Sequence, residues 1–190
     1  EMQELERLLL DTQRAADRRN VAVLHGLGGI GKTQLAVGFA RRHKGKFSGI
    51  FWLDGSSEAS LKQSFADMAL RLPRDELTAD GVAMLKSSTI DVNVAVRESL
   101  HWLSLPSNHK WLLIIDNVDR DHHDRSDSQA YDVKEYFPQA DHGSVLITSR
   151  LIRLQRRGIG VKIGTVESTQ ARAILESNAG KAVTGKRKMM

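Results

Sequence analysis

Gly26-Leu27-Gly28-Gly29-Ile30-Gly31-Lys32-Thr33 fits the pattern G-x-x-x-x-G-K-[ST], which in proteins forms a loop around phosphate groups. The apolar run Val21-Ala22-Val23-Leu24-His25 comes directly before it, and apolar residues at helical spacing follow from Lys32 onward. The loop therefore lies between a predicted buried strand and a predicted helix. Its glycines let the backbone wrap closely around an anion, and the helix N-terminus adds its positive dipole end. We predict that this loop holds phosphates; the alternative is a glycine-rich turn that binds nothing.

Three residues supply the charge and the metal ligands that such a loop needs. Lys32 is expected to reach the β- and γ-phosphates of a nucleotide, and the Thr33 hydroxyl to ligate Mg²⁺. A second metal ligand is predicted at Asp116, because the apolar run Trp111-Leu112-Leu113-Ile114-Ile115 delivers this carboxylate at the end of a strand. Taken alone, such an aspartate is more often a turn or helix cap, so the prediction depends on the phosphate loop. The next residue, Asn117, carries an amide that cannot take a proton from water, so we expect slow hydrolysis at most.

Arg150 is the remaining charged residue assigned to the site. It ends the stretch Val145-Leu146-Ile147-Thr148-Ser149-Arg150, a predicted strand of the same sheet. Ligands of parallel sheets bind at the carboxyl ends of the strands, so its guanidinium is expected near the phosphates as a sensor of the γ-phosphate. A surface arginine without this role is the alternative.

Strands alternate with helices along the chain, which predicts an α/β fold with a parallel sheet. Strands are predicted at residues 21–25, 49–53, 111–115, 143–148 and 160–163. Helices are predicted from the start of the chain to about residue 20, and at residues 32–44, 61–72, 91–104, 133–137 and 168–178. Residues 73–90 are ambiguous, with a possible short helix. The predicted architecture is the three-layer P-loop NTPase fold, a parallel five-stranded sheet with helices on both faces.

The composition is that of one globular domain: 190 residues, of which 41% are hydrophobic and 27% charged. No apolar run approaches the roughly 20 residues that span a bilayer, and there is no cysteine, so we expect a soluble, cytoplasmic protein. The net charge of +5 comes largely from local clusters without interleaved aromatic residues, so no nucleic-acid or membrane partner is expected. We assign His122 and His123 to a solvated loop, and Trp52, Trp102 and Trp111 to packing rather than base stacking.

The sequence resembles the NB-ARC class of STAND P-loop NTPases, the nucleotide switches of NOD-like receptors, plant resistance proteins and apoptotic scaffolds. Four motifs carry the resemblance in the family's order: the phosphate loop with Gln34-Leu35-Ala36 after it, Phe51-Trp52-Leu53-Asp54, the Walker B segment with a trailing acid at residues 112–119, and the sensor strand at residues 146–150. The residues within these motifs are most similar to those of NOD-like receptors of filamentous fungi. The resemblance covers roughly residues 1–180.

This resemblance implies a set of site residues and cofactors. ATP or ADP with Mg²⁺ is expected, with Thr33 and Asp116 holding the metal and Lys32, Asp116 and Arg150 carrying any catalysis. The residues implied to bind the nucleotide are Gly26, Leu27, Gly28, Gly29, Ile30, Gly31, Lys32, Thr33, Gln34 and Arg150. Asn117 stands where many members carry a second acid, which again points to a slow ATPase. Residues 1–180 are expected to form the nucleotide-binding domain without the helical and winged-helix subdomains, and residues 181–190 a disordered basic tail.

The function implied by the resemblance is regulatory. Exchange of ADP for ATP would control assembly with other receptor subunits, leading to immunity or programmed cell death. Two other classes stay open: a turning-over ATPase or small-molecule kinase, and a truncated fragment that acts as a decoy. Steady hydrolysis would favour an enzyme, whereas slow turnover with tight ADP would favour a switch.

Overall fold

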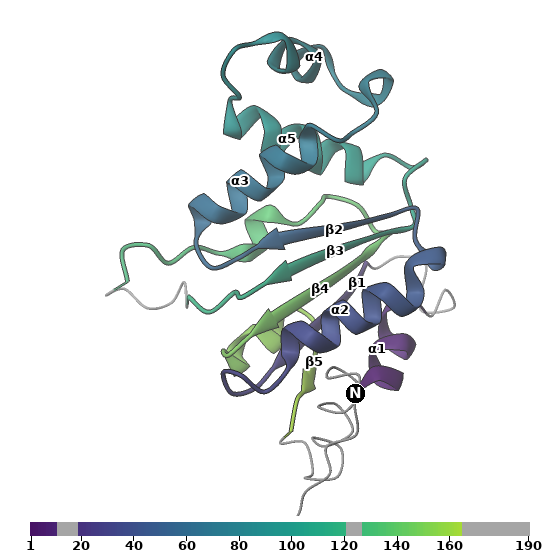
Figure 1. Cartoon of the computed structure of the whole chain (residues 1–190), viewed down its shortest axis with the longest axis vertical. Coiled ribbons are helices and arrows are strands. Elements are labelled where there is room, and N and C mark those ends of the chain that lie inside the picture. Colours follow the sequence, from purple (N-terminus) through teal and green to yellow (C-terminus); the bar gives the residue numbers. More distant parts are fainter. Residues whose placement is uncertain (11–18, 121–126, 165–190) are drawn as a thin grey trace, which may run out of the picture.

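The structure is a computed structural model that describes residues 1–10, 19–120 and 127–164 (Figure 1). Its centre is a five-stranded sheet in the order β2-β3-β4-β1-β5, in which every neighbouring pair is parallel. The strands are β1 (Asn20–His25), β2 (Gly49–Asp54), β3 (Trp111–Asp116), β4 (Ser144–Ser149) and β5 (Ile159–Lys162). Each lies at a predicted strand, so the predicted five-stranded parallel sheet is confirmed.

The inner strands are rich in apolar residues because helices cover both of their faces. Every residue of β3 and β4 is buried, whereas β2 lies at the edge of the sheet and is only partly covered. The parallel register places His25 beside Ser149 and Asp54 beside Asp116. The carboxyl ends of these four strands therefore lie together at one end of the sheet. The loop after β1 begins at the same end.

One face of the sheet is covered by α3 (Glu58–Ala69), α5 (Val92–Ser104) and the 3₁₀ helix η3 (Val133–Tyr136). Phe65 of α3 is fully buried there and stacks on Tyr136, with 6.1 Å between ring centroids. The other face is covered by α1 (Met2–Leu9) and α2 (Lys32–His43), which share a second core cluster with the sheet. The predicted three-layer arrangement, with helices on both faces, is thus confirmed (Figure 1).

The ambiguous stretch at residues 73–90 contains a short helix, α4 (Ala79–Lys86), which packs on α5 on the side away from the sheet (Figure 1). Its position depends on Glu98 of α5, which is buried and accepts a hydrogen bond from the backbone N–H of Thr78 at 3.0 Å. Thr78 in turn caps α4 by accepting from the N–H of Gly81. A contact between residues 20 positions apart fixes this helix, which explains why local periodicity left it undecided.

Some boundaries differ from the predictions. The first helix ends at Leu9, and Asn20 already belongs to β1; the intervening residues 11–18 lie outside the described ones. The predicted helix at residues 168–178 and the basic tail also lie outside them. The remaining 3₁₀ helices are η1 (Lys44–Lys46), η2 (Arg74–Glu76) and η4 (Ile152–Arg157).

None of the described helices combines the length and the apolar composition that crossing a bilayer requires.

The packing role predicted for the tryptophans is right for two of the three. Trp111 and Trp102 are buried, but Trp52 is 40% exposed, so the predicted packing role is wrong for this residue. Trp52 lies on the same face of edge strand β2 as Ile50, the face of α1 and α2. Helix α2 packs over β4, further into the sheet, so it leaves this part of the edge uncovered.

Candidate phosphate-binding site

The predicted phosphate loop, residues 26–33, joins the end of β1 to the start of α2. Gly31 is the N-cap of α2 with a left-handed φ of +100°, and its carbonyl accepts the first helical bond, from the N–H of Leu35 at 2.8 Å. A side chain at this position would strain the backbone, so the tight entry into the helix requires glycine. The entry leaves the first N–H groups of α2 without helical partners, and they give this end of the helix its affinity for anions.

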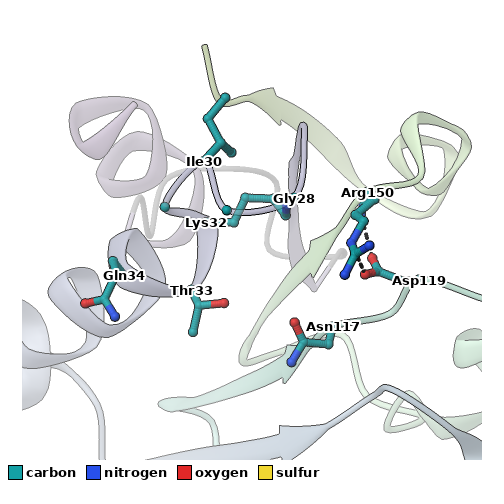
Figure 2. Close-up of a pocket in the computed structure, with 10 residues that line it drawn as sticks. Gly28, Ile30, Lys32, Thr33, Gln34, Asn117, Asp119 and Arg150 are labelled. Carbon is teal, nitrogen blue, oxygen red and sulfur yellow. Dashed lines mark hydrogen bonds and ion pairs between the residues drawn. The ribbon is translucent and has the colours of Figure 1, made fainter. Parts of the chain in front are cut away.

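Lys32 is nearly buried within its own loop. Its exposed fraction is 9%, and its ammonium donates hydrogen bonds to the carbonyls of Gly26 at 3.0 Å and Leu27 at 2.9 Å. The side chain therefore folds back over the loop and places its positive charge there. A cavity of about 220 Å³ adjoins it (Figure 2), lined by Gly28, Gly29, Ile30, Gly31, Lys32, Thr33, Gln34, Asn117, Asp119 and Arg150.

Asp116 lies at the end of β3, is 5% exposed and accepts hydrogen bonds from α2, from β4 and from the residue that follows it. The hydroxyl of Thr33 donates to it at 3.0 Å, the amide of Asn117 at 3.4 Å, and the hydroxyl of Thr148 donates as well. The carboxylate and the Thr33 hydroxyl are thus direct neighbours. Carboxylate and hydroxyl oxygens are hard ligands of the kind that Mg²⁺ takes, so these two side chains fit the metal that the resemblance implies.

Asn117 turns the chain sharply after β3. Its φ is +65°, a left-handed conformation that asparagine tolerates better than most side chains. This turn directs its N–H to the hydroxyl of Thr148 at 3.0 Å, while the N–H of Val118 reaches the carbonyl of Thr148 at 3.0 Å. Asn117 therefore has a backbone role in addition to lining the cavity, and the segment after β3 is fixed to the end of β4.

Arg150 follows β4 immediately and lies beside the phosphate loop (Figure 2). Its side chain is 68% exposed and pairs with Asp119, with 2.8 Å between Nε and Oδ2. A Cβ atom at Gly28 would come within 3.6 Å of the Arg150 Nε, so the guanidinium lies against the loop. The structure thus brings Arg150 to the cavity that Lys32 and Thr33 also line.

The loop residues are not all oriented alike. Leu27 is 73% exposed and does not line the cavity, and Gly26 packs beside Ile163 at the base of the loop. Ile30 lines the cavity at its rim and is also in contact with the core under α1 and α2. Gln34 lines the cavity from the first turn of α2, at a distance from Arg150 in Figure 2.

Two residues were given no role at the site by sequence reasoning, although Asp119 was noted as the trailing acid of the Walker B segment. Thr148 is fully buried between Asp116 and the N–H of Asn117, and Asp119 holds Arg150. A weak signal existed for the first, because a threonine and a serine interrupt the otherwise apolar strand just before Arg150. His122 and His123 lie outside the described residues.

Among the described residues, His25 is the group near the phosphate loop whose pKa is clearly shifted. His25 ends β1 and is 6% exposed. Burial, and to a smaller degree the charge of Lys162 on the neighbouring strand, lower the pKa of its imidazole. His25 is therefore neutral in the folded protein near pH 7, directly before the phosphate loop.

The model of the NB-ARC domain family matches residues 2–181 of this sequence. The chain belongs to the NB-ARC family. It is a nucleotide-binding P-loop NTPase module, and the predicted resemblance is confirmed. A nucleotide-binding leucine-rich repeat (NLR)-like protein of the fungus Hyaloscypha variabilis is 26% identical to the NB-ARC chain over 162 residues. The match covers 80% of the chain but only 15% of that relative, so the chain spans a small part of its length.

Solved structures resemble the fold of this NB-ARC chain at low identity. Cdc6p of Pyrobaculum aerophilum has a TM-score of 0.59 and 12% identity, over 97% of the chain and 50% of that protein. The ORC2 protein of Aeropyrum pernix, solved as ADPNP and ADP complexes, has a TM-score of 0.56 and 15% identity, over 94% of the chain and 51% of that protein. These likenesses concern the fold alone.

Proposed function

We propose that this NB-ARC domain binds ATP and ADP with Mg²⁺ at residues 26–33 and is the core of a signalling switch. In this proposal, nucleotide exchange in the parent NOD-like receptor controls association with other receptor subunits, in the cytoplasm, for immunity or programmed cell death. Residues 1–180 form the nucleotide-binding unit, and residues 181–190 a basic tail. The family membership and the NLR-like relative support this assignment.

The observation that carries the proposal is that two positively charged side chains line the same cavity. Lys32 is anchored in the loop, and Arg150 lies against Gly28 from the end of β4. ADP needs only the loop, whereas the γ-phosphate of ATP would add a contact with Arg150. Because a ligand shifts an equilibrium only by what it binds differently in the two states, such a contact is the element a switch requires.

The remaining site residues have defined parts in this proposal. The N–H groups of the loop and the start of α2 bind the β-phosphate, and Lys32 neutralises the β- and γ-phosphates. Thr33 and Asp116 hold Mg²⁺, which when bound would neutralise phosphate charge. Asn117 borders the same cavity as an amide, which fits slow hydrolysis rather than rapid turnover.

Titration of the purified chain with fluorescent ADP and ATP, with and without Mg²⁺, tests the site. We expect binding at micromolar concentration that Lys32→Ala abolishes and that Lys46→Ala, a change at an exposed lysine, preserves. Equal binding by the Lys32→Ala variant would contradict the proposed site. Phosphate release measured in parallel distinguishes the switch from an ATPase, because sustained turnover at many cycles per minute would favour the enzyme.

A further inference from the structure

We infer that Asp119 is a positioning residue that holds the guanidinium of Arg150 toward the phosphate loop, and thereby sets the preference for a nucleoside triphosphate over a diphosphate. The inference rests on the proposed function, since it concerns the same cavity. The inference adds Asp119 to the site, although its negative charge would by itself repel a phosphate. Removing Asp119 could therefore weaken or strengthen nucleotide binding, and the direction of the change can be measured.

Asp119 contacts Arg150 at two points, one on the backbone and one on the side chain. Oδ1 accepts a hydrogen bond from the backbone N–H of Arg150 at 2.6 Å, and Oδ2 pairs with Nε at 2.8 Å. These contacts use the backbone and the inner edge of the guanidinium. Neither contact involves the two terminal nitrogens, so both can meet an acceptor in the cavity that Arg150 lines.

The guanidinium held in this way lies directly over the loop. A Cβ atom at Gly28 would be 3.7 Å from the Cζ atom of Arg150 and 3.9 Å from Nη1. These are ordinary van der Waals distances, so the guanidinium lies against the loop and faces the backbone that would surround the phosphates. A bidentate contact with phosphate oxygens is the chemistry for which this planar group is suited.

The backbone of Asp119 is fixed by the residues before it. The segment after β3 runs along the end of β4, with Asn117 N–H bonded to the Thr148 hydroxyl at 3.0 Å and Ser149 donating to the Val118 carbonyl at 2.5 Å. Asp119 is the next residue of this attached segment. Its carboxylate is therefore held in place by β4, the strand that Arg150 directly follows.

Fixing an exposed arginine before the ligand arrives improves binding for an entropic reason. The Arg150 side chain is 68% exposed, and without Asp119 it would sample many rotamers that a phosphate contact would have to restrict. Coulomb repulsion acts in the opposite direction, because the carboxylate disfavours added negative charge nearby. Positioning predicts that removing Asp119 weakens ATP binding, whereas repulsion alone predicts that it strengthens ATP binding.

The test measures dissociation constants of ADP and of a non-hydrolysable ATP analogue, with Mg²⁺, for the intact 190-residue chain and for Asp119→Ala, Arg150→Ala and the double variant. Asp127→Ala is the matched control, because it breaks another aspartate–arginine pair, with Arg120 at 2.8 Å, close by in the same loop region. We expect Asp119→Ala to weaken analogue binding by roughly three- to tenfold with ADP nearly unchanged. In the Arg150→Ala background the same change should have no further effect, and Asp127→Ala should bind both nucleotides normally.

Other results would overturn the inference in distinguishable ways. Tighter analogue binding by Asp119→Ala would mean that repulsion dominates, and an equal loss with and without Arg150 would mean that Asp119 acts elsewhere. If Arg150→Ala leaves the ratio of analogue to ADP affinity unchanged while Lys32→Ala abolishes binding, this inference fails and the nucleotide site stands. If the unmodified chain binds neither nucleotide, the proposed function fails with it. A thermal melt of each variant separates a loss of contact from a loss of fold.

Discussion

The hydroxyl of Thr33 donates a 3.0 Å hydrogen bond to the carboxylate of Asp116, although the two residues are 83 positions apart in the sequence. Thr33 is in the first turn of α2 and Asp116 ends β3, with β4 between β1 and β3 in the sheet. The phosphate loop therefore reaches across the end of β4. The two oxygen ligands proposed for Mg²⁺ come from elements that only the completed sheet brings together.

Asp116→Asn removes the negative charge of the proposed metal ligand and keeps its shape. We expect the gain in ATP affinity on adding Mg²⁺ to fall by about tenfold, which corresponds to roughly 1.4 kcal/mol, because a neutral amide binds the ion more weakly. Titrations with Mg²⁺ and with a chelator measure this gain. Asp75→Asn, at an exposed aspartate of η2, is the control and should keep the full gain. An undiminished gain in Asp116→Asn would exclude this carboxylate as a ligand.

Asn117→Asp places a possible base beside the cavity. Aspartate also tolerates the left-handed φ of +65° found here, so the turn after β3 should persist. We expect ATP hydrolysis to increase by about tenfold or more, because a carboxylate can accept a proton from the attacking water. Phosphate release under multiple turnover measures the change. Asn117→Ala should show no increase, and an unchanged rate in Asn117→Asp would mean that the amide does not limit hydrolysis.

Gly143→Ala is expected to destabilise the fold by about 2–5 kcal/mol, through strain and overpacking together. Gly143 has a φ of +77°, and a Cβ atom there would overlap the indole ring of Trp111, which is fully buried. The indole is in turn fixed by its N–H bond to the Leu103 carbonyl at 2.8 Å, so it has little room to move. Urea unfolding gives the free energy directly. Gly45→Ala, where an added Cβ meets nothing within 4 Å, should change it little.

The stability should fall as the pH drops below the ordinary pKa of histidine, near 6.5, partly because of His25. Its pKa is lowered in the folded state, so the unfolded chain binds the proton more tightly and acid favours unfolding. The contribution of His25 is complete above about pH 6.5 and is lost as the pH falls through its folded pKa.

His25→Gln removes this titration, so its unfolding free energy should change less between about pH 7.5 and 5.5 than that of the unmodified protein. Urea denaturation at the two pH values measures the difference. His101→Gln, at an exposed histidine, should retain the unmodified dependence. The same dependence in His25→Gln would assign the loss of stability to other groups.

The sheet and the phosphate loop were predictable because their signals are local. Uninterrupted apolar runs mark strands that are covered on both faces, and β3 and β4 are buried throughout. The glycine pattern at residues 26–33 is also contiguous. From these signals, the approximate bounds of the inner strands β1, β3 and β4 and the position of the loop could be stated.

The parts that could not be predicted depend on contacts between distant segments. The position of α4 depends on Glu98, which lies in a later helix, and the exposure of Trp52 depends on where α2 crosses the sheet. The pairing of Asp119 with Arg150 joins residues 31 positions apart, and neither residue type indicates its partner. Side-chain pairing of this kind follows only once the order of the strands is known.

The place of β1 between β4 and β5 also matters while the chain is being made. Asn20 pairs with Ser144, so β1 leaves the ribosome about 124 residues before the strand that covers one of its edges. At about 5–20 residues per second, that interval lasts roughly 6–25 seconds. Throughout it, the nascent chain carries an unpaired apolar strand and a glycine loop with neither Thr148 nor Arg150 beside it. Nucleotide can therefore stabilise this protein only late in its synthesis, and the earlier part of the chain depends on whatever shields an exposed strand until β4 arrives.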